Sequence, residues 1–141
     1  MASNFADMAA GLATVLRNNI TGATVAEYPA DSVGGMPFFV VLPERVDYLL
    51  QIGGNTFEAR FRVVGLLASG DDASGFIQLY DYIDPTATEK GFRQAIDADR
   101  TLNGKADSSQ VEYVENIGRR ELFGGWYFGF DAIVTAIKSV A

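Results

Sequence analysis

Two residue types that serve much of protein chemistry are missing from this chain of 141 residues, which has neither cysteine nor histidine. Without cysteine the chain can form no disulfide and offers no thiolate to a metal ion. Without histidine it lacks the side chain most often used as a general base and as a neutral metal ligand. These absences remove most enzyme mechanisms and predict that no metal or organic cofactor is required.

Basic residues and long apolar runs are also scarce. Eighteen Asp and Glu against eleven Lys and Arg give a net charge of −7, and Arg119-Arg120 is an isolated basic pair. Tight nucleic-acid binding needs clustered Lys and Arg, whereas an acidic surface lets DNA pass without sticking. No segment approaches the ~18 apolar residues of a membrane-spanning helix. The N-terminus does not resemble a signal peptide, so we expect the protein to stay in the cytoplasm where it is made.

What the sequence does contain is the apolar content of one domain, residues 1–141, with 48% hydrophobic residues and no linker or internal repeat. Helical spacing predicts a first helix from Ser3 to about Asn19 and two central helices, at 76–83 and 88–97. Alternating apolar residues predict strands at 23–29, 38–43, 110–122 and from 125 onward.

A long hairpin is predicted in the middle of the chain. Its arms are residues 45–52 and 56–68, and its turn is "GGN". The residues assigned to this arm and its turn are Tyr48, Leu50, Gly53, Gly54 and Asn55. The order helix, strands, helices, strands predicts an α+β domain with a mainly antiparallel sheet, an N-terminal helix and a central helical pair packed on one face, and a long β-hairpin arm.

The C-terminal stretch "FGGWYFGFDAIVTAI" is unusual because it carries apolar residues on both faces of a strand. Trp126, Phe128 and Phe130 alternate onto a core face, while the opposite face mixes Asp131 and Thr135 with apolar groups. The second hairpin arm changes from charged to apolar in the same way. The residues that need a covering surface are Val64, Leu66, Tyr127, Ile133 and Ile137. Either a neighbouring subunit or a loop of the same chain would cover them.

Two acidic segments invite a chemical interpretation. Asp71 and Asp72 are candidate metal ligands or an acid–base pair, although adjacent Asp residues before a helix usually cap it and favour its dipole.

The second segment, "DRTLNGKADSSQ", has the outline of a calcium-binding loop. Its residues near ligand or turn positions are Asp99, Thr101, Asn103, Gly104 and Asp107. Gln110 stands where a bidentate Glu is required, and Thr101 stands where Asp or Asn is usual. A plain turn at Asn103-Gly104 in a mobile loop is the better explanation.

The ordered series of segments resembles the tail terminator proteins of long-tailed, non-contractile, lambda-like bacteriophages. The segments that carry this resemblance are "LATVLRNNI", "VAEYPADSV", "MPFFVVLP", "FEARFRVVGLLASGDDASG", "FIQLYDYID", "VEYVENIGRREL" and "GGWYFGFDAIVTAI". Together they span nearly the whole chain. The resemblance lies in the order and pattern of elements and includes no catalytic signature.

This resemblance implies a structural protein of the virion rather than an enzyme. Members of the family form a hexameric ring on the tail tube, stop its polymerisation and present the surface that joins the head. The implied partners are copies of the chain itself, the tail tube protein and the head–tail connector protein. Two alternatives stay open: a head-completion or adaptor ring of the same virion, and a small enzyme that uses Asp71 and Asp72.

A ring of this kind must let the genome pass through its centre. Acidic residues near the bore would repel DNA phosphates over the screening length of about 8 Å at physiological salt. The candidates for this lining are Asp71, Asp72, Asp97, Asp99 and Asp107. The alternative is that loop Asp residues cap helices or keep the surface soluble.

Overall fold

The computed structural model describes residues 4–20, 22–26, 37–48, 56–69, 73–84, 86, 91–122 and 125–139. In this part of the chain three helices and five strands form an α+β fold, as the sequence predicts. The helices are α1 (Asn4–Asn19), α2 (Ala73–Ile83) and α3 (Phe92–Asp97). The strands are β1 (Thr24–Ala26), β2 (Phe38–Asp47), β3 (Thr56–Ser69), β4 (Ser108–Leu122) and β5 (Gly125–Ser139).

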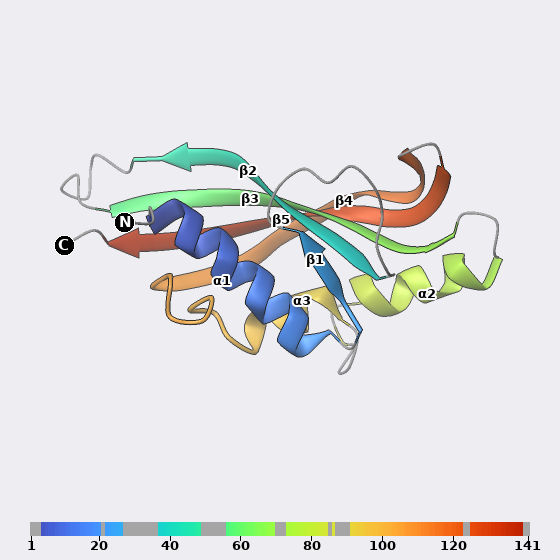
Figure 1. Ribbon diagram of the computed structural model, residues 1–141, viewed down its shortest axis with the longest axis horizontal. Coiled ribbons are helices and arrows are strands. Elements are labelled where there is room, and N and C mark those ends of the chain that lie inside the picture. The colour runs from blue at the N-terminus through green and yellow to red at the C-terminus, as the bar shows by residue number, and fades with distance from the viewer. Residues whose placement is uncertain are drawn as a thin grey trace.

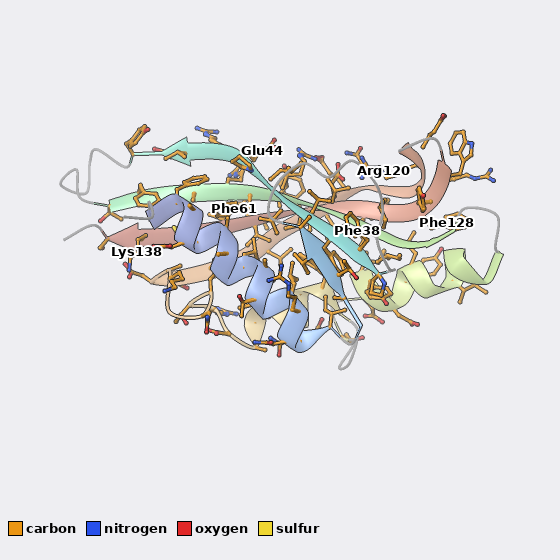
Figure 2. All side chains as sticks on the ribbon, in the orientation of Figure 1. Phe38, Glu44, Phe61, Arg120, Phe128 and Lys138 are labelled. Carbon is orange, nitrogen blue, oxygen red and sulfur yellow. The ribbon has the colours of Figure 1, made fainter. Side chains whose placement is uncertain are left out.

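The strands form one sheet in the order β1-β2-β3-β5-β4. β1 pairs parallel to β2, and the other three pairings are antiparallel. In the view of Figure 1 the helices lie along the lower side of the long strands, with α2 at the right-hand end. Figure 2 places Lys138 and Arg120 toward opposite ends of the sheet. The long central strands β3 and β5 therefore run through the whole molecule.

The main core forms because alternate residues of the long strands are apolar. On β5 the residues buried on the side of the helices are Phe130, Ala132, Val134 and Ala136, which belong to one cluster with apolar residues of α1, α2 and α3. This confirms the predicted core face for these four residues, whereas Trp126, predicted on the same face, is 49% exposed and Phe128 is half-buried. The rings of Phe39, Phe92 and Phe130 contact one another, with centroids 5.5–6.4 Å apart. We call this side of the sheet the core face and the opposite side the second face.

The prediction of two separate strands around Pro43 is wrong, because β2 is continuous from Phe38 to Asp47. Its pairing with β3 shifts between Pro43 and Arg45, which places one extra residue, Glu44, in a bulge. Proline lacks the N–H that a central strand must donate. β1 pairs only with residues 38–40 of β2, so Pro43 lies on the part of β2 that β1 does not cover.

β2 and β3 pair antiparallel, as the predicted hairpin requires, but residues 49–55, with the turn and the projecting end of the arm, lie outside the described residues. β3 also pairs with β5 as far as Thr56 opposite Ser139, so the described hairpin belongs to the sheet. Tyr48 follows the last residue of β2 and is 68% exposed. Leu50, Gly53, Gly54 and Asn55 lie outside the described residues.

The segment between α3 and β4 is anchored, whereas the sequence predicts a mobile loop. Leu102 has no exposed surface, and the Ser109 hydroxyl donates to the Arg100 carbonyl over 2.8 Å. The predicted turn at Asn103-Gly104 is confirmed, since both residues have positive φ angles of 59° and 82°. The loop is anchored although its sequence is polar, because one apolar residue, Leu102, is enough to fix it to the core.

The anchored loop approaches α1 so closely that it requires a glycine there. A Cβ atom on Gly11 would lie 2.0 Å from the Leu102 carbonyl oxygen, which is a backbone atom and cannot turn away. In an open helix position, replacing Gly by Ala stabilises the helix by up to ~1 kcal/mol. At Gly11 the clash with the Leu102 carbonyl instead destabilises the protein, and by more than the gain in helix propensity.

We predict that Gly11→Ala lowers the free energy of unfolding, because overpacking of this kind costs about 1–3 kcal/mol. Urea unfolding followed by circular dichroism measures the change. Leu102→Ala is the reference variant, with an expected loss of about 2–5 kcal/mol from the cavity it leaves. A Gly11→Ala protein as stable as the wild type would show that the loop does not contact α1.

Candidate functional site

The second face of the sheet carries a cluster of charged side chains at its centre. Arg62 projects there from β3 and Asp131 from β5, on the two central strands. A charged pair in the middle of a sheet is unusual because ionised groups lose hydration when they are buried. We therefore consider this cluster as the candidate functional site.

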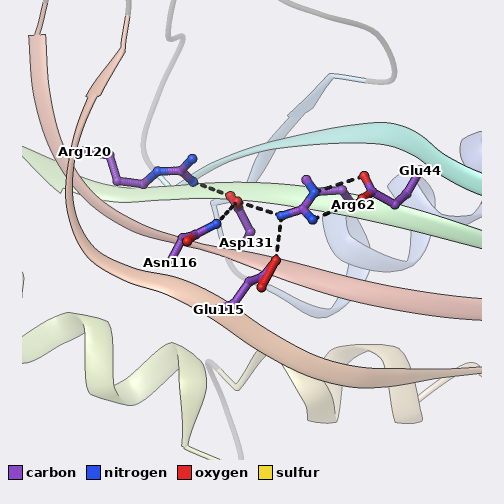
Figure 3. Close-up of polar contacts among 6 residues, drawn as sticks. All are labelled: Glu44, Arg62, Glu115, Asn116, Arg120 and Asp131. Atoms are coloured by element: carbon purple, nitrogen blue, oxygen red, sulfur yellow. Dashed lines mark hydrogen bonds and ion pairs between the residues drawn. The ribbon is translucent and has the colours of Figure 1, made fainter.

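Asp131 is the buried member of the cluster, with 3% of its surface exposed. Its carboxylate accepts hydrogen bonds from Arg62 Nη1 at 2.9 Å and from Asn116 Nδ2 at 2.8 Å, and from Arg120 Nη1 (Figure 3). Two guanidinium groups and an amide thus replace the water that a carboxylate normally binds. A buried charge is tolerated only with such partners.

Arg62 connects this buried carboxylate to the surface. It forms a bidentate ion pair with Glu44, at 3.0 Å and 3.1 Å, and contacts Glu115 Oε1 at 3.0 Å (Figure 3). The hydrogen bond to Glu44 is the largest cause that raises the pKa of the Arg62 guanidinium above its ordinary value. The same hydrogen bond lowers the pKa of the Glu44 carboxyl. Both groups are therefore firmly charged at neutral pH.

A second ion pair lies further along the same face. Arg60 Nη2 contacts Glu112 Oε1 at 3.2 Å, and the same oxygen accepts a hydrogen bond from the Thr135 hydroxyl at 2.5 Å. Thr135 is buried, and the side chains of Arg60 and Glu112 are 27% and 25% exposed. The polar cluster therefore extends across β3, β5 and β4.

Two strand irregularities aim side chains at the cluster. The bulge in β2 places Glu44 next to Arg62, and the shift in β4 between Glu115 and Gly118 brings Asn116 to Asp131. Asn116 has a φ angle of 53°, a left-handed conformation that asparagine tolerates better than most residues. Bulges often re-aim side chains at functional or structural sites.

This arrangement suits a structural role better than acid–base catalysis. A general acid or base needs a pKa near the working pH, but the pKa of Glu44 is lowered, away from neutrality. Asp131, Glu112 and Glu115 each accept hydrogen bonds or ion pairs from arginine. Across the part of the chain that the structure describes, no group of three or more carboxylates could hold a metal ion.

The structure corrects the expected covering surface. Leu66 and Ile133 have no exposed area within the single chain, so they need no neighbouring subunit. Leu66 belongs to a small second-face cluster with Phe38 and Val40. For these two residues the chain covers itself, and an Asp substitution there would disrupt the fold rather than assembly alone.

The other three residues that were predicted to need a covering surface remain partly exposed. Val64 and Tyr127 are half-buried at the edge of the small second-face cluster, and Ile137 is 40% exposed. Tyr113, which the sequence reading missed, is 45% exposed and pairs with Ile133 across β4 and β5. A shift in register near Glu112 turns it onto this face, and sequence periodicity does not reveal such shifts.

The described acidic residues of the proposed bore lining each have a local contact. Asp97 lies 3.7 Å from Arg93 and 3.3 Å from Arg100. Asp107 accepts a hydrogen bond from the Ser139 backbone N–H at 2.9 Å and lies 4.0 Å from Lys138 Nζ. These contacts explain both residues without DNA. Asp71 and Asp72 lie outside the described residues, so neither their capping nor their chemical role is tested.

The loop that resembles a calcium site uses its carboxylate internally. Asp99 Oδ1 accepts hydrogen bonds from the Thr101 hydroxyl and backbone N–H, and Oδ2 accepts one from the Asn103 N–H. The hydrogen bond from the Thr101 hydroxyl is the main cause that lowers the pKa of Asp99. Gln110, at the twelfth position, has become part of β4.

Two further observations bear on identity. Among the described helices, none has the length and apolar character needed to cross a membrane. No protein-family model matches the sequence, and no curated protein matches it either.

We predict that Asp131→Asn destabilises the protein by about 3 kcal/mol, because it leaves two arginines facing a buried site without its charge. The matched variant is Glu44→Gln, which removes another carboxylate partner of Arg62. The Glu44 side chain is 36% exposed, so this variant should lower the free energy of unfolding by less than about 1 kcal/mol. Urea unfolding of both variants provides the comparison. Equal losses would show that Asp131 does not anchor the cluster.

We also predict that calcium leaves the melting temperature unchanged. A site filled at a hundred times its dissociation constant would add about 2.7 kcal/mol of stability. Thermal unfolding with calcium or with a chelator present measures this, and magnesium serves as the ionic control. A rise of several degrees with calcium alone would overturn the assignment of Asp99 as a turn residue.

Proposed function

We propose that this protein is a structural virion protein that forms a ring at the head-proximal end of a phage tail. In this role it caps the tail tube, stops its polymerisation and forms the tail side of the head–tail joint. Its partners would be copies of itself, in a ring of six, together with the tail tube protein and the head–tail connector protein. It would be made in the host cytoplasm and would require no cofactor.

Three observations support this proposal. The chain has an α+β fold with a mostly antiparallel sheet, which is consistent with the fold class that the order of segments predicts. The polar cluster of the second face consists of ion-paired groups and suits stability rather than proton transfer. The observation that carries the proposal is the exposed apolar surface on the same face, at Ile137 and Tyr113.

The exposed apolar residues are suited to contact between subunits. Val64, Tyr127 and Ile137 remain as proposed interface residues, and Tyr113 joins them. Burying an Ile side chain contributes on the order of 1.5–3 kcal/mol, and six identical contacts in a closed ring act together. The finer arrangement, with three helices on one face and an arm at 48–55 that reaches a neighbour, is part of this proposal.

A head-completion or adaptor ring of the same virion is the second candidate. A head-completion ring would use the same fold and the same interface as a tail terminator. The two roles are therefore distinguished by the particles that form when the protein is missing. DNA would pass through either ring without specific binding. In both cases Asp71 and Asp72 are the acidic residues proposed for the bore, since Asp97, Asp99 and Asp107 already have local partners.

We predict that Ile137→Asp prevents capping while leaving the subunit folded. Ile137 is 40% exposed, so the carboxylate can stay in water in the free protein but not in a contact. The assay supplies each variant to particles that lack the protein and counts tails with a capped end by electron microscopy. Ile77→Asp is the matched control, since Ile77 is 67% exposed on α2 and lies away from the second face.

The expected result is normal capping by Ile77→Asp and a loss of at least about tenfold with Ile137→Asp. Circular dichroism should show similar melting for both. If Ile137→Asp caps tails as well as the wild type does, the second face is not the contact between subunits.

A further inference from the structure

The far end of the second face carries an unusual arrangement of charge. In the pairing of β2 with β3, Arg45 lies opposite Arg60, and Asp47 lies opposite Glu58. Like charges directly opposite each other destabilise a strand pair. Pairs within the chain offset part of this cost, because Arg45 lies 3.8 Å from Asp47 and Arg60 lies 3.2 Å from Glu112, but the two like-charged rows remain side by side.

These four residues, which we call the charge square, surround a hollow. The hollow has a volume of about 150 Å³ and is lined by Arg45, Asp47, Glu58 and Arg60. The side chains of Arg45 and Asp47 are 64% and 47% exposed and lie 3.8 Å apart. Arg60 Nε is buried and has no hydrogen-bond partner among the described residues. The site is thus open on one side and incompletely satisfied on the other.

We propose that the charge square binds the charge square of a second copy of this chain. When two copies of one face meet across a twofold axis that lies in the interface, positions along the axis are kept. Positions along the in-plane direction perpendicular to the axis are reversed. If the axis lies in the plane of the face, between the two rows and perpendicular to the strands, the arginine row of one copy meets the acidic row of the other. Arg45 then faces Asp47 of the second copy, and Arg60 faces its Glu58.

The balance of charge selects a second copy over other partners. The square holds two positive and two negative groups, so a purely acidic or purely basic surface meets as much repulsion as attraction. A matching partner must carry the same two rows in the opposite order, and this chain supplies such a surface itself. Contacts of this isologous type are the most common in protein oligomers.

A neighbouring side chain adds apolar area to this contact. Ile137 pairs with Glu58 across β3 and β5 and is 40% exposed. Apolar groups beside a charged centre give a contact area beyond the ion pairs themselves, which contribute little when they are exposed to water.

Pairing through the edge of β2 is the competing way to join two copies. Pro43 has no N–H to donate, and the bulge at Glu44 interrupts the regular ladder. Both features are typical of edge strands that avoid pairing with another chain. Side chains on the face, rather than the backbone at the edge, therefore make the contact.

This inference goes beyond the proposed function, since a pair of copies related by a twofold axis is a different assembly from the ring; because both contacts use Ile137, a subunit makes one of them at a time. Ring contacts are head-to-tail, whereas the charge square is self-complementary. The two claims fail separately: sedimentation of the purified protein tests the pair, and capping of tails tests the ring.

The test measures the mass of the full chain by sedimentation equilibrium. The wild type should form dimers at concentrations up to about 100 μM, and more weakly in high salt, because salt screens exposed charges. Arg45→Glu and Asp47→Arg should each weaken the dimer at least about tenfold, since each places like charges in contact twice. Arg93→Glu is the matched control, with a side chain of similar exposure (58%) on α3, and should dimerise normally.

Mixing the two variants tests the pairing itself. In a mixed dimer, Glu at position 45 of one copy faces Arg at position 47 of the other, and the native Asp47 faces the native Arg45. The mixture should therefore dimerise although neither variant does alone. Both side chains are exposed, so circular dichroism should show unchanged folding. A monomeric wild type, an Arg45→Glu protein that still dimerises, or a mixture that stays monomeric would each overturn the proposal.

Discussion

The fold is organised around one buried carboxylate. Asp131 lies on a central strand with 3% of its surface exposed, so it must find donors within the protein. Arg62, Arg120 and Asn116 supply them. Glu44 and Glu115 then balance the charge of Arg62. The bulge at Glu44 and the register shift beside Asn116 are the backbone changes that bring these partners into reach.

The sequence predicts the core face far better than the second face. Alternation on β5 identifies Phe130, Ala132 and Val134 correctly as core-face residues, because successive side chains of a strand point to opposite faces. It fails at Pro43, where a bulge keeps one strand continuous. It also fails for the loop at Leu102, which a single buried side chain anchors. Side-chain partners across strands depend on register, and register is not visible in one sequence.

The same limit applies to the candidate site. The charge-to-apolar switch in β3 and β5 predicts a contact surface on the second face, but Leu66 and Ile133 are buried by their own chain. The surface left for partners is therefore smaller than expected and lies around Ile137 and Tyr113. The ion pairs that Arg62 forms with Glu44 and Asp131 limit where another subunit can pack, because these charges already have partners. Contact with another subunit is therefore expected beside this cluster rather than on it.

The most direct test of the proposed role is the length of the tails made without this protein. Deleting its gene from the virus and imaging the particles by electron microscopy measures that length and the state of the heads. A tail terminator is the part that stops tube growth, so the account predicts overlong tails that are not joined to heads. Free tails of normal length together with heads that leak DNA would contradict it and would instead assign the protein to head completion.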